Sequence, residues 1–241
     1  MIEQIFQINY EFEPWTLQHT LPVILFLILG WWMIRTARNW SEPLKWKIPF
    51  TVSLLLPFSI VLWIVIRLLR GEFDITEDLP LNMCNLVTFF LPFIFIRHKP
   101  NQLFFGIIYF WVLSGTLQAV ITPGLEQAFP HFWYFRYWLI HCGLVILILY
   151  AVIILKYYPK WRDLWNAFIA MNVLFVISFG INLLIGSNYL YTMEKPAQAS
   201  ILDYFGPWPV YLMVSEIVAL GFFLVYFYPF LKYYRKQVEQ P

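Results

Sequence analysis

The sequence predicts an all-α fold, a polytopic membrane bundle of seven transmembrane helices with the N-terminus outside and the C-terminus cytoplasmic. The first observation is that only 12% of the 241 residues are charged and 61% are hydrophobic. Soluble domains carry about 25% charged residues, so this composition favours a bilayer as the solvent. The second is a series of long apolar segments, and the third is the way in which the charges alternate between the connections.

Seven segments are long and apolar enough to span a bilayer, and together they form a single transmembrane domain covering 1–241. The longest connection, about 186–208, contains two glycines and two prolines and is predicted to be a loop. Pro57 and Pro92 fall inside the second and third segments, where they are expected to kink the helices. The predicted spans are about 17–34, 48–69, 79–96, 103–121, 133–155, 164–185 and 209–230.

The charges predict the orientation of the bundle. Basic residues gather in alternate connections and in the C-terminal tail, and the positive-inside rule places those connections in the cytoplasm. The opposite connections are mostly acidic, so the N-terminus is expected outside. The basic set is Arg35, Arg38, Lys45, Lys47, Arg97, Lys99, Lys156, Lys160, Arg162, Lys232, Arg235 and Lys236, and the acidic set is Glu3, Glu11, Glu13, Glu72, Asp74, Glu77, Asp78, Glu126, Glu194 and Asp203.

Several polar side chains are expected at one depth in the outer half of the bundle. At 1.5 Å per residue, Cys84 lies ~8 Å below the outer boundary, and His141 lies at a comparable depth. Polar groups inside a membrane are costly, so a shared depth suggests a pocket that opens outward. The other members of this layer are Glu216, Arg67, Gln118, Asn182, Asn82 and Asn85.

Each of these residues also has a purely structural interpretation. A cysteine in a membrane helix is often a small buried hydrophobe, and a lone histidine often forms a structural hydrogen bond. Arg67 could extend toward the outer headgroups, and Asn182 and Gln118 could join helices. A carboxyl as deep as Glu216 must be protonated, paired or hydrated.

The residue types in this layer restrict the chemistry. Only His141 lies well inside a predicted helix, whereas a catalytic zinc needs several such ligands, so we expect no metal and no cofactor. A cysteine–histidine pair remains. The imidazole of His141 would take the proton of the Cys84 thiol, and the thiolate would attack an ester carbonyl while side-chain amides stabilise the oxyanion. Glu216 or Asn182 could orient His141.

Two short motifs carry a family resemblance. Leu-Asn-Met-Cys-Asn at 81–85 and Tyr-Trp-Leu-Ile-His at 137–141 resemble the signatures of the YwaF/transmembrane-protein-164 family, and the seven-helix plan is similar to that family over most of the chain. The eukaryotic branch consists of phospholipid acyltransferases that carry the acyl chain on a cysteine, assisted by a histidine. The resemblance implies that Cys84 is the nucleophile and His141 the base. Asn82 stands where bacterial relatives often have a histidine.

The leading hypothesis is therefore an acyltransferase, or a related lipid acyl hydrolase, that moves an acyl chain between membrane phospholipids through a Cys84 thioester. Arg67 or Arg136 could bind the lipid phosphate, and no nucleic-acid partner is expected. The short loops favour a bacterial cytoplasmic membrane. Two alternatives remain open: a transporter or binding protein with Glu216 and Arg67 as charged contacts, and a scaffold in which the polar layer only fixes helix packing. A Cys84–Cys142 disulfide would exclude the nucleophile.

Overall fold

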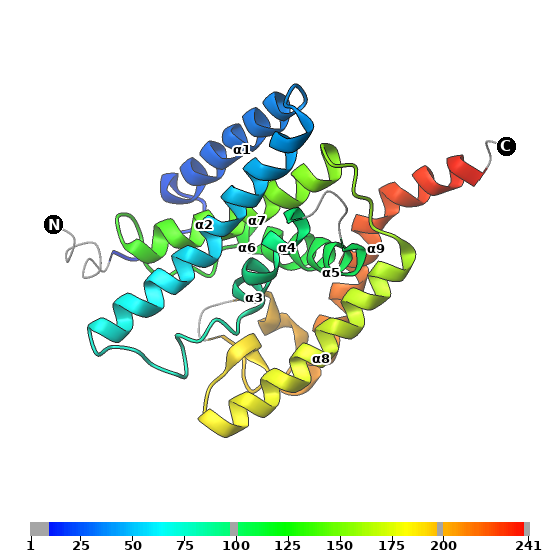
Figure 1. Ribbon diagram of the computed structural model, residues 1–241. Coiled ribbons are helices and arrows are strands. Elements are labelled where there is room, and N and C mark those ends of the chain that lie inside the picture. Colours follow the sequence, from blue (N-terminus) through cyan, green and yellow to red (C-terminus); the bar gives the residue numbers. More distant parts are fainter. Residues whose placement is uncertain (1–9, 97–100, 197–199, 239–241) are drawn as a thin grey trace.

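A computed structural model describes residues 10–96, 101–196 and 200–238, and its elements are helices (Figure 1). The bundle begins with α1 and α2, and a loop then leads to the short pair α3 and α4. The bounds are α1 Leu17–Ala37, α2 Glu42–Leu69, α3 Met83–Phe90, α4 Pro92–Phe95, α5 Gln102–Trp111, a π-helical turn Val112–Thr116, α6 Leu117–Ile121, α7 Phe132–Ile153, α8 Trp161–Ile185, 3-10 turns Tyr189–Tyr191 and Ile201–Phe205, and α9 Val210–Val238.

Within the described residues, six helices are long and apolar enough to cross a membrane, which confirms a polytopic helical bundle. They correspond to the predicted segments other than the third, and α5, the π turn and α6 together form one of them. The third segment differs from its predicted bounds. It is helical only over Met83–Phe95, which at 1.5 Å per residue is ~20 Å, shorter than a hydrocarbon core of about 30 Å.

Two features of the chain shorten this third segment. The residues before Met83 form turns, because Asp74 and Asp78 bind backbone and side-chain donors of their own loop. At the other end the helix breaks at Leu91, ahead of Pro92, which lacks the N–H needed to continue the hydrogen-bond ladder. The interruption thus falls at Pro92, where the sequence predicts a kink, whereas Pro57 lies inside the continuous helix α2.

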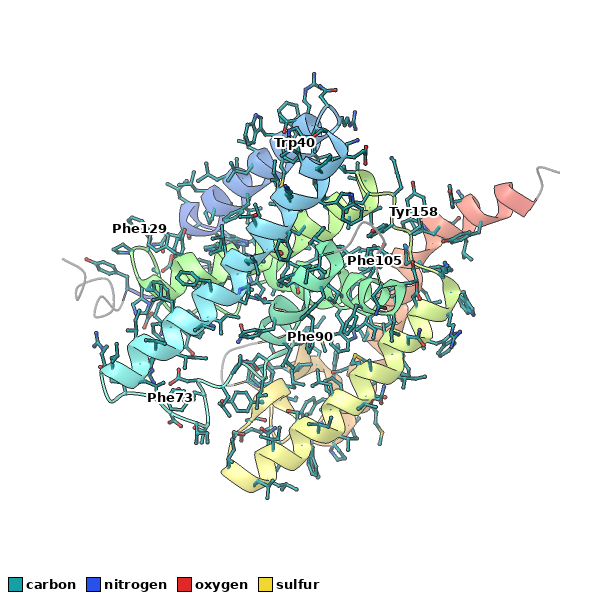
Figure 2. All side chains as sticks on the ribbon, viewed as in Figure 1. Trp40, Phe73, Phe90, Phe105, Phe129 and Tyr158 are labelled. Atoms are coloured by element: carbon teal, nitrogen blue, oxygen red, sulfur yellow. The ribbon has the colours of Figure 1, made fainter. Side chains whose placement is uncertain are left out.

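The loops gather at two ends of the bundle, as an alternating path through a membrane requires. We call the end that holds the α2–α3 loop and the loop after α8 the acidic end. We call the end that holds the α1–α2 and α7–α8 loops the basic end. At the acidic end, Tyr189 binds Ile75 and Leu79 of the α2–α3 loop. At the basic end, the Tyr150 hydroxyl donates to the Lys45 carbonyl. Figure 2 shows the labelled Trp40 at the top of the molecule, Tyr158 at the upper right, and Phe73 and Phe129 on the left.

The charge pattern fits these two ends where the structure describes it. Asp78 and Glu72 lie at the acidic end beside Arg67, and Arg162 lies at the basic end beside the start of α8. Glu3, Arg97 and Lys99 lie outside the described residues, as do the side chains of Arg235 and Lys236. The placement of the acidic end outside the cell stays a prediction from the positive-inside rule.

The centre of the bundle is formed by the segment α5–α6 and by α7, which Figure 1 shows between the other helices. Over half of the apolar stretch of each (56%) is buried, whereas α1 and α2 reach 22% and α8 and α9 only 17%. Gly106 brings α5 close to α8, since a Cβ at that position would lie 2.4 Å from the Cβ of Asp163. The exposed apolar faces of the outer helices suit contact with lipid.

Candidate functional site

Cys84 lies in the first turn of α3, directly after Met83 and two residues beyond the N-cap position, Asn82. The first backbone hydrogen bond of this helix runs from Leu86 N to Asn82 O (3.0 Å), so the preceding N–H groups have no intrahelical acceptor. Such a helix start favours negative charge, both on a cysteine sulfur and on an oxyanion beside it. The short third segment therefore places the thiol at a helix terminus rather than within a continuous span.

Thr116 is the nearest polar partner of this thiol. Its hydroxyl oxygen lies 3.4 Å from the Cys84 sulfur, and its side chain is buried. Thr116 ends the π-helical turn Val112–Thr116. Ser114 in the same turn bonds back to the Phe110 carbonyl, as hydroxyl side chains in helices commonly do, but Thr116 bonds to the cysteine instead. Single π turns inside α-helices frequently occur at functional sites.

His141 is held by Tyr137, one turn earlier on α7. The two rings stack with centroids 4.0 Å apart, and His141 Nδ1 lies 2.8 Å from the Tyr137 carbonyl oxygen. A carbonyl oxygen only accepts, so in this hydrogen bond Nδ1 carries the proton. In the neutral imidazole, Nε2 then has the free lone pair, which is the state that a general base requires.

Tyr137 also lies near the cysteine. Its phenol lies within electrostatic range of Cys84, and its hydroxyl donates to the Ala119 carbonyl at 2.8 Å. Helix α3 packs against both α7 and the π turn, so the three elements meet around the thiol. Among the described residues, no hydrogen bond joins Cys84 to His141. Catalytic hydrogen bonds often tighten only when substrate is bound.

A cavity of about 550 Å³ opens at the acidic end, next to the start of α3. Asn82, predicted to bind substrate, lines it two residues before the cysteine. Tyr191 also lines it, whereas Cys84, Thr116, Tyr137 and His141 are not among its lining residues. Further lining residues are Trp63, Arg67, Arg70, Glu72, Asp78, Trp133 and Tyr189.

The two arginines predicted to contact substrate occupy different positions around this cavity. Arg67 lines it but is already paired, with Nε 3.0 Å from Asp78 and Nη1 3.7 Å from Glu72. Arg136 is buried behind the cavity wall, with its guanidinium carbon 4.2 Å from the centre of the Trp133 ring. The structure thus places Arg67 in an ion-pair cluster and Arg136 in an aromatic one.

Asn182 does not join this site. Its amide nitrogen donates to Tyr189 O and Thr192 Oγ1, and its oxygen accepts from Ser187 Oγ and Tyr189 N, all within 2.6–2.9 Å. These four bonds use both donors and both lone pairs of the amide, so none is left to orient His141. Asn182 instead fastens the loop that follows α8, where Gly186 ends the helix with a left-handed φ of 71°.

The remaining predicted residues are dispersed. Gln118 interacts with the Tyr226 hydroxyl on α9. Glu216 lies half-buried near the start of α9, and Asn85 is half-buried in α3. Within the described part of the chain, neither of these two side chains has a hydrogen-bond or ion-pair partner.

The other histidines and the second cysteine have structural surroundings. His19 is buried and lies 2.9 Å from the Val120 carbonyl through Nε2, and its ring stacks on Trp138. His131 is the N-cap of α7. Cys142 is buried in a separate apolar cluster with Trp138, and both cysteines are free, so the alternative disulfide does not form. Among the described residues, no three His, Cys, Asp or Glu side chains are grouped to bind a metal.

Two members of the site escaped sequence reasoning, Thr116 and Tyr137. Tyr137 could have been found, because it stands one helical turn before His141, the spacing at which helical side chains meet. Thr116 gave a weaker signal, a Ser-Gly-Thr run at 114–116 inside an apolar segment. The π turn that directs it toward the cysteine has no sequence pattern of its own.

Comparison with known proteins places the whole bundle in one family. The model of the TMEM164 family matches residues 13–227, which covers every candidate site residue described above. Neither the curated proteins nor the solved structures contain a significant match to the chain. Because the family model spans most of the sequence, the chain belongs to the TMEM164 family of membrane proteins.

Proposed function

We propose that the chain is an integral membrane acyltransferase that moves an acyl chain between phospholipids through a thioester on Cys84. The observation that carries this proposal is the surroundings of the thiol. It lies at a helix start beside Thr116, and on the neighbouring helix α7 Tyr137 fixes the base tautomer of His141. A scaffold would require none of these relationships.

The first half of the reaction would form the acyl-enzyme. His141 Nε2 accepts the thiol proton, and the Cys84 sulfur attacks the ester carbonyl of the donor lipid. The resulting oxyanion is stabilised by free backbone N–H groups at the start of α3, with Asn82 and Asn85 as nearby amide donors. The intermediate collapses to the thioester, and the departing lysophospholipid oxygen takes the proton back from His141.

The second half would return the acyl chain to a lipid. The hydroxyl of an acceptor lysophospholipid gives its proton to His141 Nε2, and its oxygen attacks the thioester carbonyl. The carbon–sulfur bond breaks, the thiolate leaves, and the proton of the imidazolium restores the thiol. Water in place of the acceptor would make the same site a lipid acyl hydrolase. The short loops support a bacterial cytoplasmic membrane as the location, with the acidic end in the outer leaflet.

Lipid exchange in proteoliposomes tests this function. A donor phospholipid with a deuterated acyl chain is mixed with an unlabelled lysophospholipid, and the labelled product is measured by mass spectrometry. We expect transfer by the native protein and none by folded Cys84→Ser or His141→Ala variants, whereas Cys142→Ser transfers normally. Unchanged transfer by the Cys84→Ser variant would exclude the mechanism.

One observation favours a second function, a transporter or lipid-binding protein. Glu216 is half-buried in the membrane-spanning part of α9, and within the described residues it has no partner. Ionisable residues in such positions often mark substrate or ion pathways. Uptake into proteoliposomes that is lost in Glu216→Gln but retained in Cys84→Ser would favour this alternative.

A further inference from the structure

Arg136 stands out among the buried groups that the proposed chemistry does not use. The residue is 7% exposed, and its Nη1 atom is buried without a hydrogen-bond partner in the part of the chain that the structure describes. A buried guanidinium with an unsatisfied donor is costly, because the group has lost its water without gaining an acceptor. This arrangement needs a physical reason.

Two tryptophans of the cavity wall fix the position of this guanidinium. Its carbon lies 4.2 Å from the centre of the Trp133 ring and 6.0 Å from that of Trp63, and both rings line the 550 Å³ cavity at the acidic end. Arginine commonly stacks on aromatic faces, which hold its plane without using its N–H donors. The cation of Arg136 is therefore held directly behind these two rings of the cavity wall, and its Nη1 donor has no acceptor among the described residues.

The carboxylate of Asp78 does not satisfy the Nη1 donor of Arg136. Asp78 lies within electrostatic range of Arg136, but its Oδ2 accepts from Arg67 Nε at 3.0 Å and from Asp74 N at 2.8 Å. Its Oδ1 lies 3.3 Å from the Trp63 indole nitrogen. Asp78 thus holds Arg67 and Trp63 in place, and Arg136 is left for an anion from outside the chain.

The charges around the cavity select the kind of anion. Two arginines line the cavity, Arg67 and Arg70, and Arg136 lies behind its wall; four carboxylates also line it, those of Glu72, Glu77, Asp78 and Glu126. Extra negative charge near this rim is disfavoured, so a group with one charge fits better than a group with two. A phosphodiester has one charge and oxygen acceptors suited to a guanidinium fork, whereas inorganic phosphate and phosphomonoesters approach two charges.

We propose that Arg136, directly behind the wall of the cavity at the acidic end, binds the phosphodiester of a phospholipid headgroup that enters through this cavity. This inference rests on the proposed function for its lipid and adds the residue that selects it. The cavity volume is in the range of ligand sites, and Asn82, two residues before the cysteine, lines the cavity. In a glycerophospholipid only a few bonds separate the phosphate from the ester carbonyls, so one anchored headgroup positions the ester near Cys84.

Binding is tested with full-length Cys84→Ser protein, which cannot form the thioester. The probes are dihexanoylphosphatidylglycerol, a phosphodiester, dihexanoylglycerol, which lacks phosphate, and inorganic phosphate, each titrated calorimetrically into protein in the same detergent. We expect the phosphodiester to bind at least tenfold more tightly than either of the others. Equal affinity for dihexanoylglycerol would overturn the proposal, and displacement of the lipid by equimolar inorganic phosphate would reassign the site to free phosphate.

Variants of the arginine give a second, independent test. In the same background Arg136→Gln should weaken phosphodiester binding at least tenfold, Arg136→Lys should be intermediate, and the exposed Arg162→Gln at the basic end is the matched loss of charge that should have no effect. Unchanged binding by Arg136→Gln contradicts the inference. If Arg136→Gln does not fold, Arg136→Lys tests the role of the residue. The comparison of probes in the parent protein still tests the preference for a phosphodiester.

These results separate the inference from the proposed function. Arg136-dependent binding without an acyl adduct on native Cys84 would leave the headgroup site standing and remove the enzyme. An acyl adduct on Cys84, together with phosphodiester binding that does not depend on Arg136, would leave the enzyme standing and remove the headgroup site.

Discussion

The Cys84 thiol and the Thr116 hydroxyl lie 3.4 Å apart, although the two residues belong to different helices. The contact depends on two irregularities, the start of α3 within the bundle and the π turn that ends at Thr116. In a regular helix a threonine hydroxyl would bond to its own backbone. The deviation from regular helix geometry thus directs a polar group to the sulfur.

Replacing Thr116 with valine removes this hydroxyl and preserves the shape. We expect acylation of Cys84 to slow by at least about tenfold, which corresponds to roughly 1.4 kcal/mol for one hydrogen bond to a reacting group. Thr116→Ser should restore the rate. The matched control is Thr51→Val, an exposed residue of α2 whose hydroxyl bonds to the Lys47 carbonyl. If the Thr116→Val variant acylates at the native rate, the contact between Thr116 and Cys84 contributes only packing and no catalysis.

His141→Ala should slow acylation strongly without unfolding the bundle, because it removes the base and leaves the backbone intact. General base catalysis contributes about 10²–10⁴-fold, so a loss of that order is expected. The control is His19→Gln, since His19 bonds to the Val120 carbonyl and joins α1 to α6. That variant should lower the melting temperature in detergent and leave the acylation rate of the folded fraction unchanged. The opposite pattern would exchange the roles of the two histidines.

Asn182→Ala tests whether this residue serves the loop or the catalytic histidine. Its loss leaves the Tyr189 N–H and the buried Ser187 hydroxyl without their acceptor, and we expect roughly 2–4 kcal/mol of destabilisation. Asn166→Ala, on the same helix and without a hydrogen-bond partner among the described residues, should cost little. Unfolding in denaturing detergent measures both. Normal stability with lost acylation would restore Asn182 to the catalytic group.

The loop that borders the cavity should depend on pH through Asp74. The side chain and then the backbone N–H of Thr76 donate to its carboxylate and hold the pKa of Asp74 below its ordinary value. A carboxyl with a lowered pKa stabilises the folded loop above its ordinary pKa, and this contribution is lost as the pH falls through the lowered value.

Hydrogen exchange at the Thr76 amide measures this effect. Protection should be constant from pH 7 to about 5 and should decrease below the ordinary aspartate pKa of about 4, once rates are corrected for intrinsic exchange. Asp74→Asn should remove the decrease. Protection that falls with pH in the variant as well would assign the transition to other groups.

Much of this organisation could be predicted from the sequence because composition and helical length dictate it. The bundle, its alternating ends and the break at Pro92 follow from apolar length, charge and the missing N–H of proline. The family motifs likewise indicated Cys84 and His141. The direction in which each side chain faces was harder to predict, because the depth of a residue along a helix does not determine its position around the helix axis. Asn182 matched the cysteine in depth, yet it faces the Ser187–Thr192 loop.

The most direct measurement of the central claim is the mass of the Cys84 peptide after native protein is incubated with a phospholipid donor. We expect the Cys84 peptide to gain the mass of one acyl chain, and neutral hydroxylamine should remove this mass because it cleaves thioesters. The added mass should be absent in Cys84→Ser and present in Cys142→Ser. Lipid exchange that proceeds while Cys84 stays unmodified, or while Cys84→Ser remains active, would contradict the central claim.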